Sequence, residues 1–306
     1  STLRHTLFPY TTLFRSNIPG DWQDDRIFLR FGGVNNLAIV RIDGDEIGQH
    51  ASGYTAFEYE ITDKVEPGRT HQLEVEVHTF GPFHKFDNLD FWHLVGIYRP
   101  VTLEARPAEH ITDWHYRTDW HAEKGQADVW IGGQVASNRT GADTRMLRVQ
   151  LNDLHTEPAQ AVAGKCVIDD DGTFETTLHV DQPRGWTAET PNLYRVQLEL
   201  TNKKDKLIDS VEEDIGLREI ETRNGKLLVN GRPIRLFGAA RHDLWPPTGR
   251  VVPDEVSRRD VELMKQMGLN AVRTAHHPPD EAFLKWADQL GLYVIDNIPM
   301  SNLRVE

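Results

Sequence analysis

Two histidines in the last third of the chain stand where polar side chains could meet a ligand. His242 follows the apolar run IRLFGAAR, and His276 follows NAVRTA. A neutral imidazole both donates and accepts a hydrogen bond, so two such rings can bind hydroxyl groups without burying a charge. The alternative is that each histidine is a solvated loop residue at the end of a strand. The residue types favour a neutral ligand.

Arg273 and Trp245 lie close to these histidines in the sequence. Arg273 stands three residues before His276 in the same run, where a guanidinium that points inward would need a carboxylate partner. The alternative for Arg273 is an ion pair between domains. Trp245 follows His242 in a loop, where its apolar ring face could line a cleft.

The adjacent pair His276-His277 raises the question of a metal site. Neighbouring residues in a strand point to opposite faces, so these two rings cannot readily bind one ion. A metal-dependent hydrolase that uses His242 and His276 is the other form of this hypothesis. It predicts an activity that a chelator removes and zinc restores.

The elements that carry these residues alternate between strand and helix. The runs IRLFGAARH, NAVRTAH and LYVID predict strands, and Asp254 or Ser257 is expected to cap a first helix that Gly268 ends. A second helix is expected to open at Asp280 and end at Gly291. Two consecutive strand–helix units with short loops predict a parallel sheet and the start of a TIM barrel. The apolar helix faces are expected to hold Val256, Leu263, Met264 and Met267, and then Phe283, Trp286, Ala287 and Leu290.

The preceding two thirds of the chain are predicted to be all-β. Alternating runs such as RIFLRF, NLAIVRI, AFEYEI and HQLEVEVHTF predict a β-sandwich, with a hairpin turn at Asp43-Gly44. A second set of strands, with DVWIGGQV, MLRVQLND, FETTLHV and LYRVQLEL, extends to about Leu217 and suits an immunoglobulin-like sandwich. The linker between the two is expected at residues 106–109.

The N-terminal segment is excluded from this fold. Residues 6–16, TLFPYTTLFRS, contain no uninterrupted apolar stretch and no small-residue cleavage site, so they predict neither a signal peptide nor a membrane span. They resemble the conceptual translation of a sequencing adapter. Residues 1–16 are therefore expected to be an adapter-like artefact, and the genuine sequence is expected to begin near Asn17.

Composition argues against several partners. The formal net charge is -13 over 306 residues, and no basic run is present, so neither nucleic acid nor membrane is an expected partner. The single cysteine, Cys166, cannot form an intramolecular disulfide, which suits a reducing compartment. A cytoplasmic location is the resulting expectation.

Three stretches of the chain together resemble glycoside hydrolase family 2. They are DNLDFWHLVGIYRPV at 87–101, WTAETPNLY at 186–194, and the run over 216–296 in which GLREI, LLVNGRPI, GAARHD, ELMKQMGLNAVRTAHHP and WADQLGLYVID follow in order. The first stretch is more similar to the β-galactosidases of the family than to its β-glucuronidases or β-mannosidases.

The resemblance implies a multidomain β plus α/β protein. Its domains would be a partial jelly-roll sugar-binding domain at 17–106, an immunoglobulin-like β-sandwich at 107–218, and the first three strands of a TIM barrel catalytic domain at 219–306. Since a closed barrel has eight strands, this last part is expected to be truncated and aggregation-prone. The resemblance places both catalytic glutamates of a retaining glycosidase on later strands, beyond Glu306. No catalytic residue is assigned, and the fragment is expected to be inactive.

The resemblance also implies roles for particular residues. The implied substrate-binding residues are Asp90, His242, His276 and Trp245, with Arg273 supporting the nucleophile. Asp90 corresponds to the aspartate of the galactose subsite and of a sodium site, although Asp87 or a plain turn role is the alternative. No cofactor is assigned to this fragment, while Mg²⁺ and Na⁺ are implied for the full-length parent. The implied partner is a β-galactoside or oligosaccharide, and the parent is expected to be a homo-oligomer.

Two positions depart from the family pattern. The chain has Asp296-Asn297 where the family has Asp-Glu, and His277 replaces the aromatic residue of H-Y-P. Altered specificity and a frame error both explain these changes. The expected activity of the parent is retaining hydrolysis of terminal β-galactosides; the alternatives are a β-glucuronidase and a non-catalytic carbohydrate-binding protein. Trp92 is expected in the core of its own domain.

Overall fold

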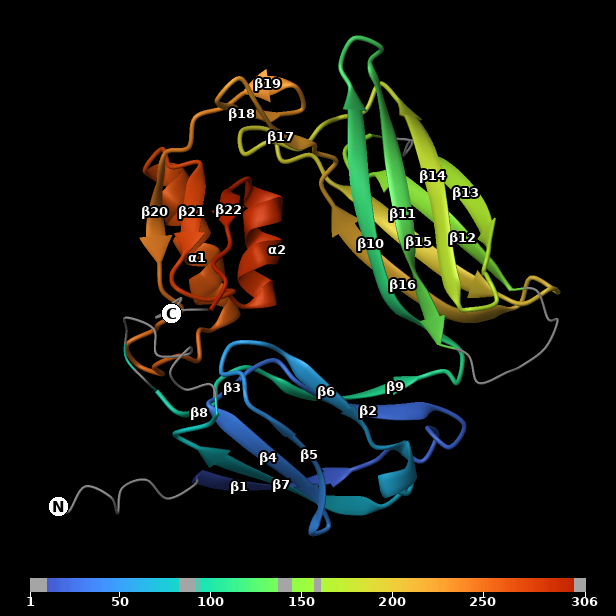
Figure 1. The fold of residues 1–306 in the computed structure, drawn as a ribbon, viewed down its shortest axis with the longest axis vertical. Helices are drawn as coiled ribbons and strands as arrows, with labels where there is room; N and C mark the ends of the chain where they lie inside the picture. The colour runs from blue at the N-terminus through green and yellow to red at the C-terminus, as the bar shows by residue number, and fades with distance from the viewer. Residues whose placement is uncertain (1–9, 83–91, 93, 137–144, 157–160, 300–306) are drawn as a thin grey trace, which may run out of the picture.

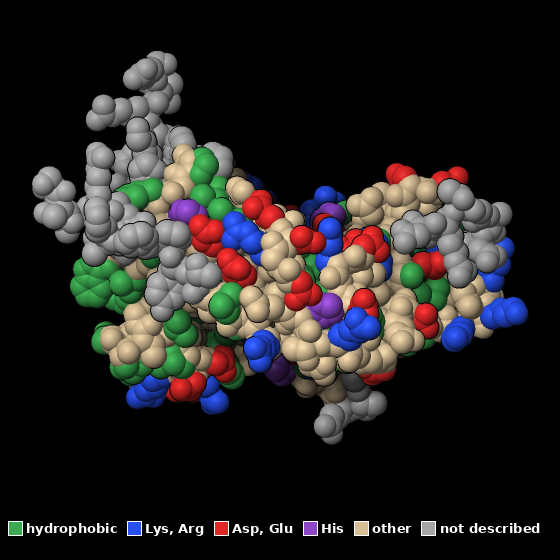
Figure 2. Space-filling model, turned by 90° about the horizontal axis from the view of Figure 1, so that it is seen from below, with side chains coloured by type: hydrophobic (Ala, Val, Ile, Leu, Met, Phe, Trp, Pro, Cys, Tyr) green, Lys and Arg blue, Asp and Glu red, His purple; other side chains and the backbone are tan. Residues whose placement is uncertain are grey.

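The computed structural model describes residues 10–82, 92, 94–136, 145–156 and 161–299. Figure 1 shows three domains: a jelly roll at the bottom, an immunoglobulin-like sandwich at the upper right and a barrel portion at the upper left. No helix in the described ranges is long and apolar enough to cross a membrane. Figure 2, seen from the jelly-roll side, shows acidic and basic side chains interspersed on that face.

The jelly roll consists of two facing sheets. One runs in the order β1 (Tyr10–Asn17), β7 (Thr70–His78), β4 (Leu37–Ile42), β5 (Asp45–His50); the other runs β6 (Phe57–Glu60), β2 (Arg26–Phe31), β9 (Val101–Arg106). A short pair joins β3 (Val34–Asn35) to β8 (Gly96–Ile97), and a 3-10 turn η2 spans Thr62–Lys64. Alternate residues of β4 and β7 are buried between the sheets, as the sequence pattern predicts. The hairpin turn at Asp43-Gly44 is confirmed, since both residues have positive φ angles, 51° and 91°.

The exclusion of residues 10–16 from the fold is wrong. Tyr10–Asn17 forms β1, which pairs antiparallel with β7 along its whole length, from Tyr10 opposite Val77 to Asn17 opposite Thr70. A strand can join a sheet edge through its backbone alone, whatever its side chains are. Its side chains bury little, because Leu13 and Phe14 remain 61% and 39% exposed.

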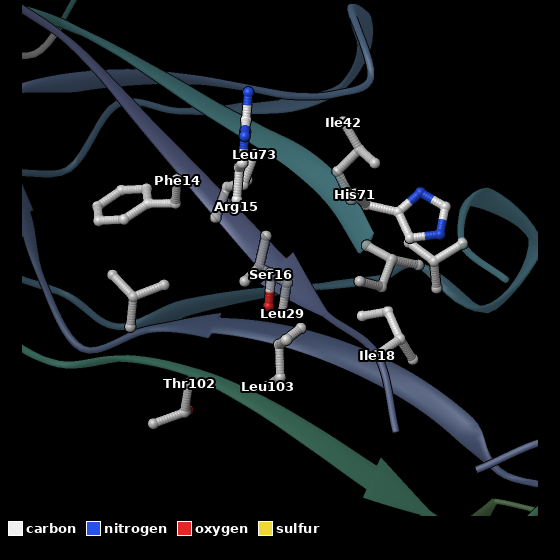
Figure 3. Close-up of a pocket in the computed structure, with 13 residues that line it drawn as sticks. Phe14, Arg15, Ser16, Ile18, Leu29, Ile42, His71, Leu73, Thr102 and Leu103 are labelled. Atoms are coloured by element: carbon white, nitrogen blue, oxygen red, sulfur yellow. The ribbon is translucent and has the colours of Figure 1, made fainter. Parts of the chain in front are cut away.

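A cavity of about 250 Å³ lies beside β1. The residues of β1 opposite Val75, Leu73 and His71 face the core, and they are Thr12, Phe14 and Ser16. Figure 3 shows Ser16 pointing toward Leu29 and Leu103 of the opposite sheet. Small polar side chains at two of these three positions leave the space between the sheets unfilled.

The middle domain is the predicted β-sandwich. Among the described residues, β10 (His110–His121), β11 (Gln126–Ala136) and β14 (Thr173–Asp181) form one sheet, and β13 (Ala161–Val167), β12 (Met146–Asp153), β15 (Tyr194–Thr201) and β16 (Leu207–Ile215) form the other. The core between them is aliphatic, with Val129, Ile131, Leu147 and Leu198 fully buried. Packing rather than a disulfide holds the two sheets together.

The last domain begins with a small antiparallel sheet and continues as a parallel one. β17 (Ile220–Arg223), β18 (Lys226–Val229) and β19 (Arg232–Pro233) precede the parallel strands β20 (Gly238–Arg241), β21 (Ala271–Thr274) and β22 (Tyr293–Ile295). The helices α1 (Asp254–Gln266) and α2 (Glu281–Leu290) connect the parallel strands. This is the strand–helix alternation that the sequence predicts for the start of a barrel.

The two helices differ in how well their ends were predicted. Asp280 caps α2 by accepting from the Ala282 N–H, and Gly291 ends it with φ 82°, as expected. The predicted N-cap of α1 is wrong: Pro253 is the N-cap, and Asp254 instead accepts a hydrogen bond from Trp286 Nε1 at 2.8 Å. The predicted end of α1 is confirmed, since Gly268 follows the C-cap Met267 with φ 78°.

The predicted apolar face of α1 is also partly wrong. Leu263 and Met267 are 40% and 75% exposed, whereas Val261 is fully buried. Val261 packs with Val272 and Phe283, so the buried side of α1 is set by where β21 and α2 lie. The spacing of apolar residues in the sequence does not by itself show which side of α1 is buried.

Trp186 joins the sandwich to the barrel portion. Its indole is buried with Ala188 and Leu193 of the sandwich and with Ala271 and Tyr293 of the parallel sheet. Its Nε1 donates to the Asp288 carbonyl of α2 at 2.8 Å. The WTAETPNLY stretch therefore acts as a contact between domains.

Candidate active site

The structure brings His242 and His276 together. His242 follows β20, and His276 comes two residues after the end of β21. Because the two strands are parallel neighbours, their carboxyl ends meet at one edge of the sheet. The imidazole centroids are 5.4 Å apart, with an edge-to-face angle of 72°. Figure 1 shows this edge facing the jelly roll.

Arg273 lies in the same region, and its described partner is an amide. Its side chain is exposed, and Nε donates to the Asn297 side-chain oxygen at 3.0 Å. Within the described ranges no carboxylate lies at ion-pair distance from Arg273. The support of a nucleophile glutamate, which the resemblance places beyond Glu306, stays a prediction. Thr274 Oγ1 donates to Asp296 at 2.9 Å and accepts from the Asn297 N–H at 3.0 Å. Asn297, which departs from the family pattern, is therefore bound to the strand ends.

Trp245 lies in a tight turn three residues after His242. Its N–H donates to the Gly249 carbonyl at 2.7 Å, and the residue is 38% exposed. Leu94 of the jelly roll lies against this turn, since a Cβ on Gly249 would be 2.9 Å from Leu94 Cδ1. The turn therefore stands between the two domains.

Two further predictions concern jelly-roll residues, Trp92 and Asp90. The expectation of a buried Trp92 is wrong, because the residue is 69% exposed. It precedes β8 in a connecting segment and does not alternate into a sheet core. Asp90 and Asp87 lie outside the described residues.

His277 lies in a buried contact between domains. It is 2% exposed, and its ring stacks on Tyr54 of the jelly roll at 4.6 Å. The pKa of His277 is lowered to about 4, mainly by burial and also by the charges of Arg250 and Arg99, while its hydrogen bond to the Pro278 carbonyl and the charge of Asp243 oppose the shift. Among the described residues no group of three His, Cys, Asp or Glu side chains is arranged to hold a metal ion.

A buried charged cluster lies behind the two histidines, and the sequence analysis did not predict it. Asp243, whose side chain is 6% exposed, forms an ion pair with Arg241 and accepts from Arg99 Nη2 at 3.5 Å. Arg241 also pairs with Asp260 at 2.8 Å. The only signal in the sequence was that Arg99 lies in the 87–101 motif and Asp243 in GAARHD.

Family models account for the three domains in turn. Residues 9–107 match the sugar-binding domain of glycosyl hydrolases family 2, residues 109–218 match the model described as glycosyl hydrolases family 2, and residues 220–306 match the TIM barrel domain of that family. The chain belongs to glycoside hydrolase family 2. Its fold is the family's N-terminal jelly roll, immunoglobulin-like sandwich and part of the TIM barrel.

Curated members of family 2 are similar over most of this chain. A β-galactosidase of Photobacterium profundum is 33% identical over 291 residues, and one of Priestia megaterium is 32% identical over 281 residues; each alignment covers 90% of this chain. The chain spans 28% and 27% of the length of these two relatives.

Solved family 2 structures share the arrangement of the domains. A Bacteroides uniformis β-glucuronidase superposes with a TM-score of 0.85 at 29% identity, over 98% of this chain and 37% of that one. A family 2 member from Bacteroides cellulosilyticus superposes with a TM-score of 0.83 at 26% identity, over 95% of this chain and 40% of that one.

Proposed function

We propose that this chain forms the substrate-binding part of a retaining β-galactosidase. The observation that carries the proposal is the His242–His276 pair, two imidazoles 5.4 Å apart at the carboxyl edge of the barrel sheet. Active sites of TIM barrels are built at this edge, and imidazoles there can donate to and accept from sugar hydroxyls. The curated β-galactosidase relatives support galactose as the sugar.

Catalysis needs two carboxyl groups about 5–5.5 Å apart, one as nucleophile and one as acid/base. We assign neither to a described residue, since by resemblance both are glutamates on later barrel strands. In this proposal His242 and His276 hold the glycosyl ring, Trp245 lines the rim, and Arg273 with Asn297 borders the position of the nucleophile. No step of the proposal runs through a metal ion.

The experiment titrates the chain with methyl β-D-thiogalactoside, which is not hydrolysed, and follows the two histidine rings by NMR. We expect saturable shifts of both rings, and loss of binding by at least about tenfold in His242→Ala. The exposed His155 in the sandwich provides the control, and His155→Ala should bind as the parent chain does. Unchanged ring signals at saturating sugar would contradict the proposal.

Turnover separates the enzyme from a sugar-binding protein. With chromogenic β-galactoside we expect no turnover by these 306 residues and turnover with retention by a protein that also contains the later barrel strands. A full-length protein that binds without turnover would instead be the non-catalytic alternative.

A β-glucuronide is the second candidate substrate. The Bacteroides uniformis β-glucuronidase supports it, and so does the exposed guanidinium of Arg273, which would pair with the carboxylate of a uronic acid. Tighter binding of the thioglucuronide than of the thiogalactoside, abolished in Arg273→Met, would replace our first proposal by this one.

A further inference from the structure

Arg99 reaches from the jelly roll into the barrel portion. It comes two residues after the end of β8 in the chain, and only 10% of its side chain is exposed. Its Nη2 donates to the Pro278 carbonyl oxygen at 2.6 Å and to Asp243 Oδ2 at 3.5 Å, and its Nε lies 3.8 Å from Asp280 Oδ2. One guanidinium therefore contacts acceptors on two separate segments of the barrel.

These two segments are the ones that carry the histidine pair. Asp243 is the residue after His242, and Pro278 lies two residues after His276. The segments come from the ends of different strands, β20 and β21, whose pairing stops directly before the histidines, where the Ala275 N–H donates to the Arg241 carbonyl oxygen at 2.8 Å. Beyond that bond the ladder of the two strands does not continue. Arg99 links them from outside the barrel sheet.

The charges make this link hard to break. Asp243 is nearly buried and stands between two guanidinium groups, those of Arg241 and Arg99, and it also accepts from the Asp280 N–H at 3.1 Å. Removing one partner of a buried charge leaves the other poorly compensated. A planar guanidinium with five donors can serve acceptors on both segments at once, which a lysine ammonium on a single stem cannot do in the same geometry.

We infer that Arg99 is a positioning residue that sets the spacing between His242 and His276, so that the jelly roll controls the geometry of the sugar site. The sugar-site role of the histidines rests on the proposed function, whereas the positioning itself does not. The jelly roll would then act on specificity through Arg99 even where it does not touch the sugar.

A second ion pair between the same two domains provides the control. Arg30 of β2 donates to Glu281 at the start of α2 at 2.5 Å, and this pair contacts neither histidine segment. Arg30→Met removes an interdomain ion pair as Arg99→Met does. A role limited to docking the domains predicts similar effects of the two changes.

The experiment measures cross-relaxation between the two imidazole rings by NMR in histidine-labelled chain without sugar. We expect the ring–ring signal in the parent and in Arg30→Met, and its loss in Arg99→Met. Thiogalactoside binding should weaken by about tenfold in Arg99→Met and change less than twofold in Arg30→Met. If Arg99→Met does not fold, Arg99→Lys makes the same comparison, because lysine keeps the positive charge and lacks the planar guanidinium that serves both segments.

The outcomes separate this inference from the proposed function. An unchanged ring–ring signal in Arg99→Met, or an equal loss in Arg30→Met, overturns the positioning role. A lost ring signal in a chain that never binds thiogalactoside supports the positioning role and contradicts the proposed sugar site.

Discussion

His277 is a histidine in a buried, aromatic environment. It replaces an aromatic residue of the family pattern, and the structure gives it an aromatic residue's environment, stacked on Tyr54 and buried. Arg250, with its guanidinium carbon 4.8 Å from the Tyr54 ring centroid, adds a positive charge to the same contact. A neutral imidazole suits this place, because a second positive charge there would be poorly solvated.

We predict that His277 makes the chain less stable in acid. The pKa of His277 is lowered to about 4 in the folded chain, whereas an unfolded histidine titrates near 6.5. Between these values the unfolded chain binds a proton that the folded chain does not, so stability is full above pH 6.5 and falls toward pH 4. His277→Phe keeps the ring and should flatten this slope, by on the order of 1–3 kcal/mol between pH 7 and pH 4.

The measurement is the free energy of urea unfolding at several pH values in the parent and in His277→Phe. The difference between the two curves isolates His277 from the other titrating groups. Curves that run parallel from pH 7 to pH 4 would show that His277 is not the source of the slope.

At the scale of elements, β1 shows that pairing and packing are separate requirements. Its backbone pairs with β7 in full register, while the polar side chains of Thr12 and Ser16 stand where the facing strands present apolar ones. The cavity of about 250 Å³ is the result. Its sequence predicts no core strand, and the strand indeed contributes little to the core.

We predict that filling this cavity stabilises the jelly roll. Ser16→Leu places an aliphatic side chain among Leu29, Leu73 and Leu103 and should raise the free energy of unfolding by about 1–2 kcal/mol. Asn17→Leu makes a comparable change on the opposite, exposed face of the same strand and should have little effect. The test is urea unfolding of both variants; equal shifts would mean that strand propensity, not the cavity, determines the gain.

At the scale of the molecule, the domains are joined by close contacts. Gly291 at the end of α2 approaches Ala188 of the sandwich, so that a Cβ on Gly291 would lie 2.3 Å from the Ala188 carbonyl oxygen. Lys265 of α1 donates to that same carbonyl oxygen at 2.5 Å and to the Gly291 carbonyl at 2.7 Å. The sandwich therefore holds the ends of both barrel helices.

We predict that Gly291→Ala lowers the free energy of unfolding mainly through a clash with Ala188, and less through strain at the end of α2. Gly291 and Gly268 follow α2 and α1 with similar positive φ angles, 82° and 78°, but Gly268 has nothing within 4 Å of its Cβ position. Gly268→Ala should cost about 1 kcal/mol from backbone strain, and Gly291→Ala about 1–3 kcal/mol more from the clash. Urea unfolding followed by circular dichroism checks this, and equal losses would contradict a tight contact at Ala188.

Much of the fold followed from the sequence alone. Alternation along β4 and β7, the Asp43-Gly44 turn, and the Asp280 and Gly291 ends of α2 are local properties, set by side-chain period and backbone conformation within a few residues. The placement of His242 and His276 at one edge followed as well, since neighbouring parallel strands end on the same side. The order of the family motifs gave the three domains.

The tertiary structure alone decided what these residues contact. Arg273 pairs with Asn297 rather than a carboxylate, Trp92 is exposed, and β1 joins the sheet against its side-chain pattern. The Arg99–Asp243 link joins residues 144 positions apart in the chain. Such contacts depend on how whole domains dock, and docking is a sum over many distant atoms that no local pattern encodes. The sequence thus determined that the two histidines lie at one edge of the sheet, and the docking of the jelly roll determined that Arg99 contacts the segments that carry them.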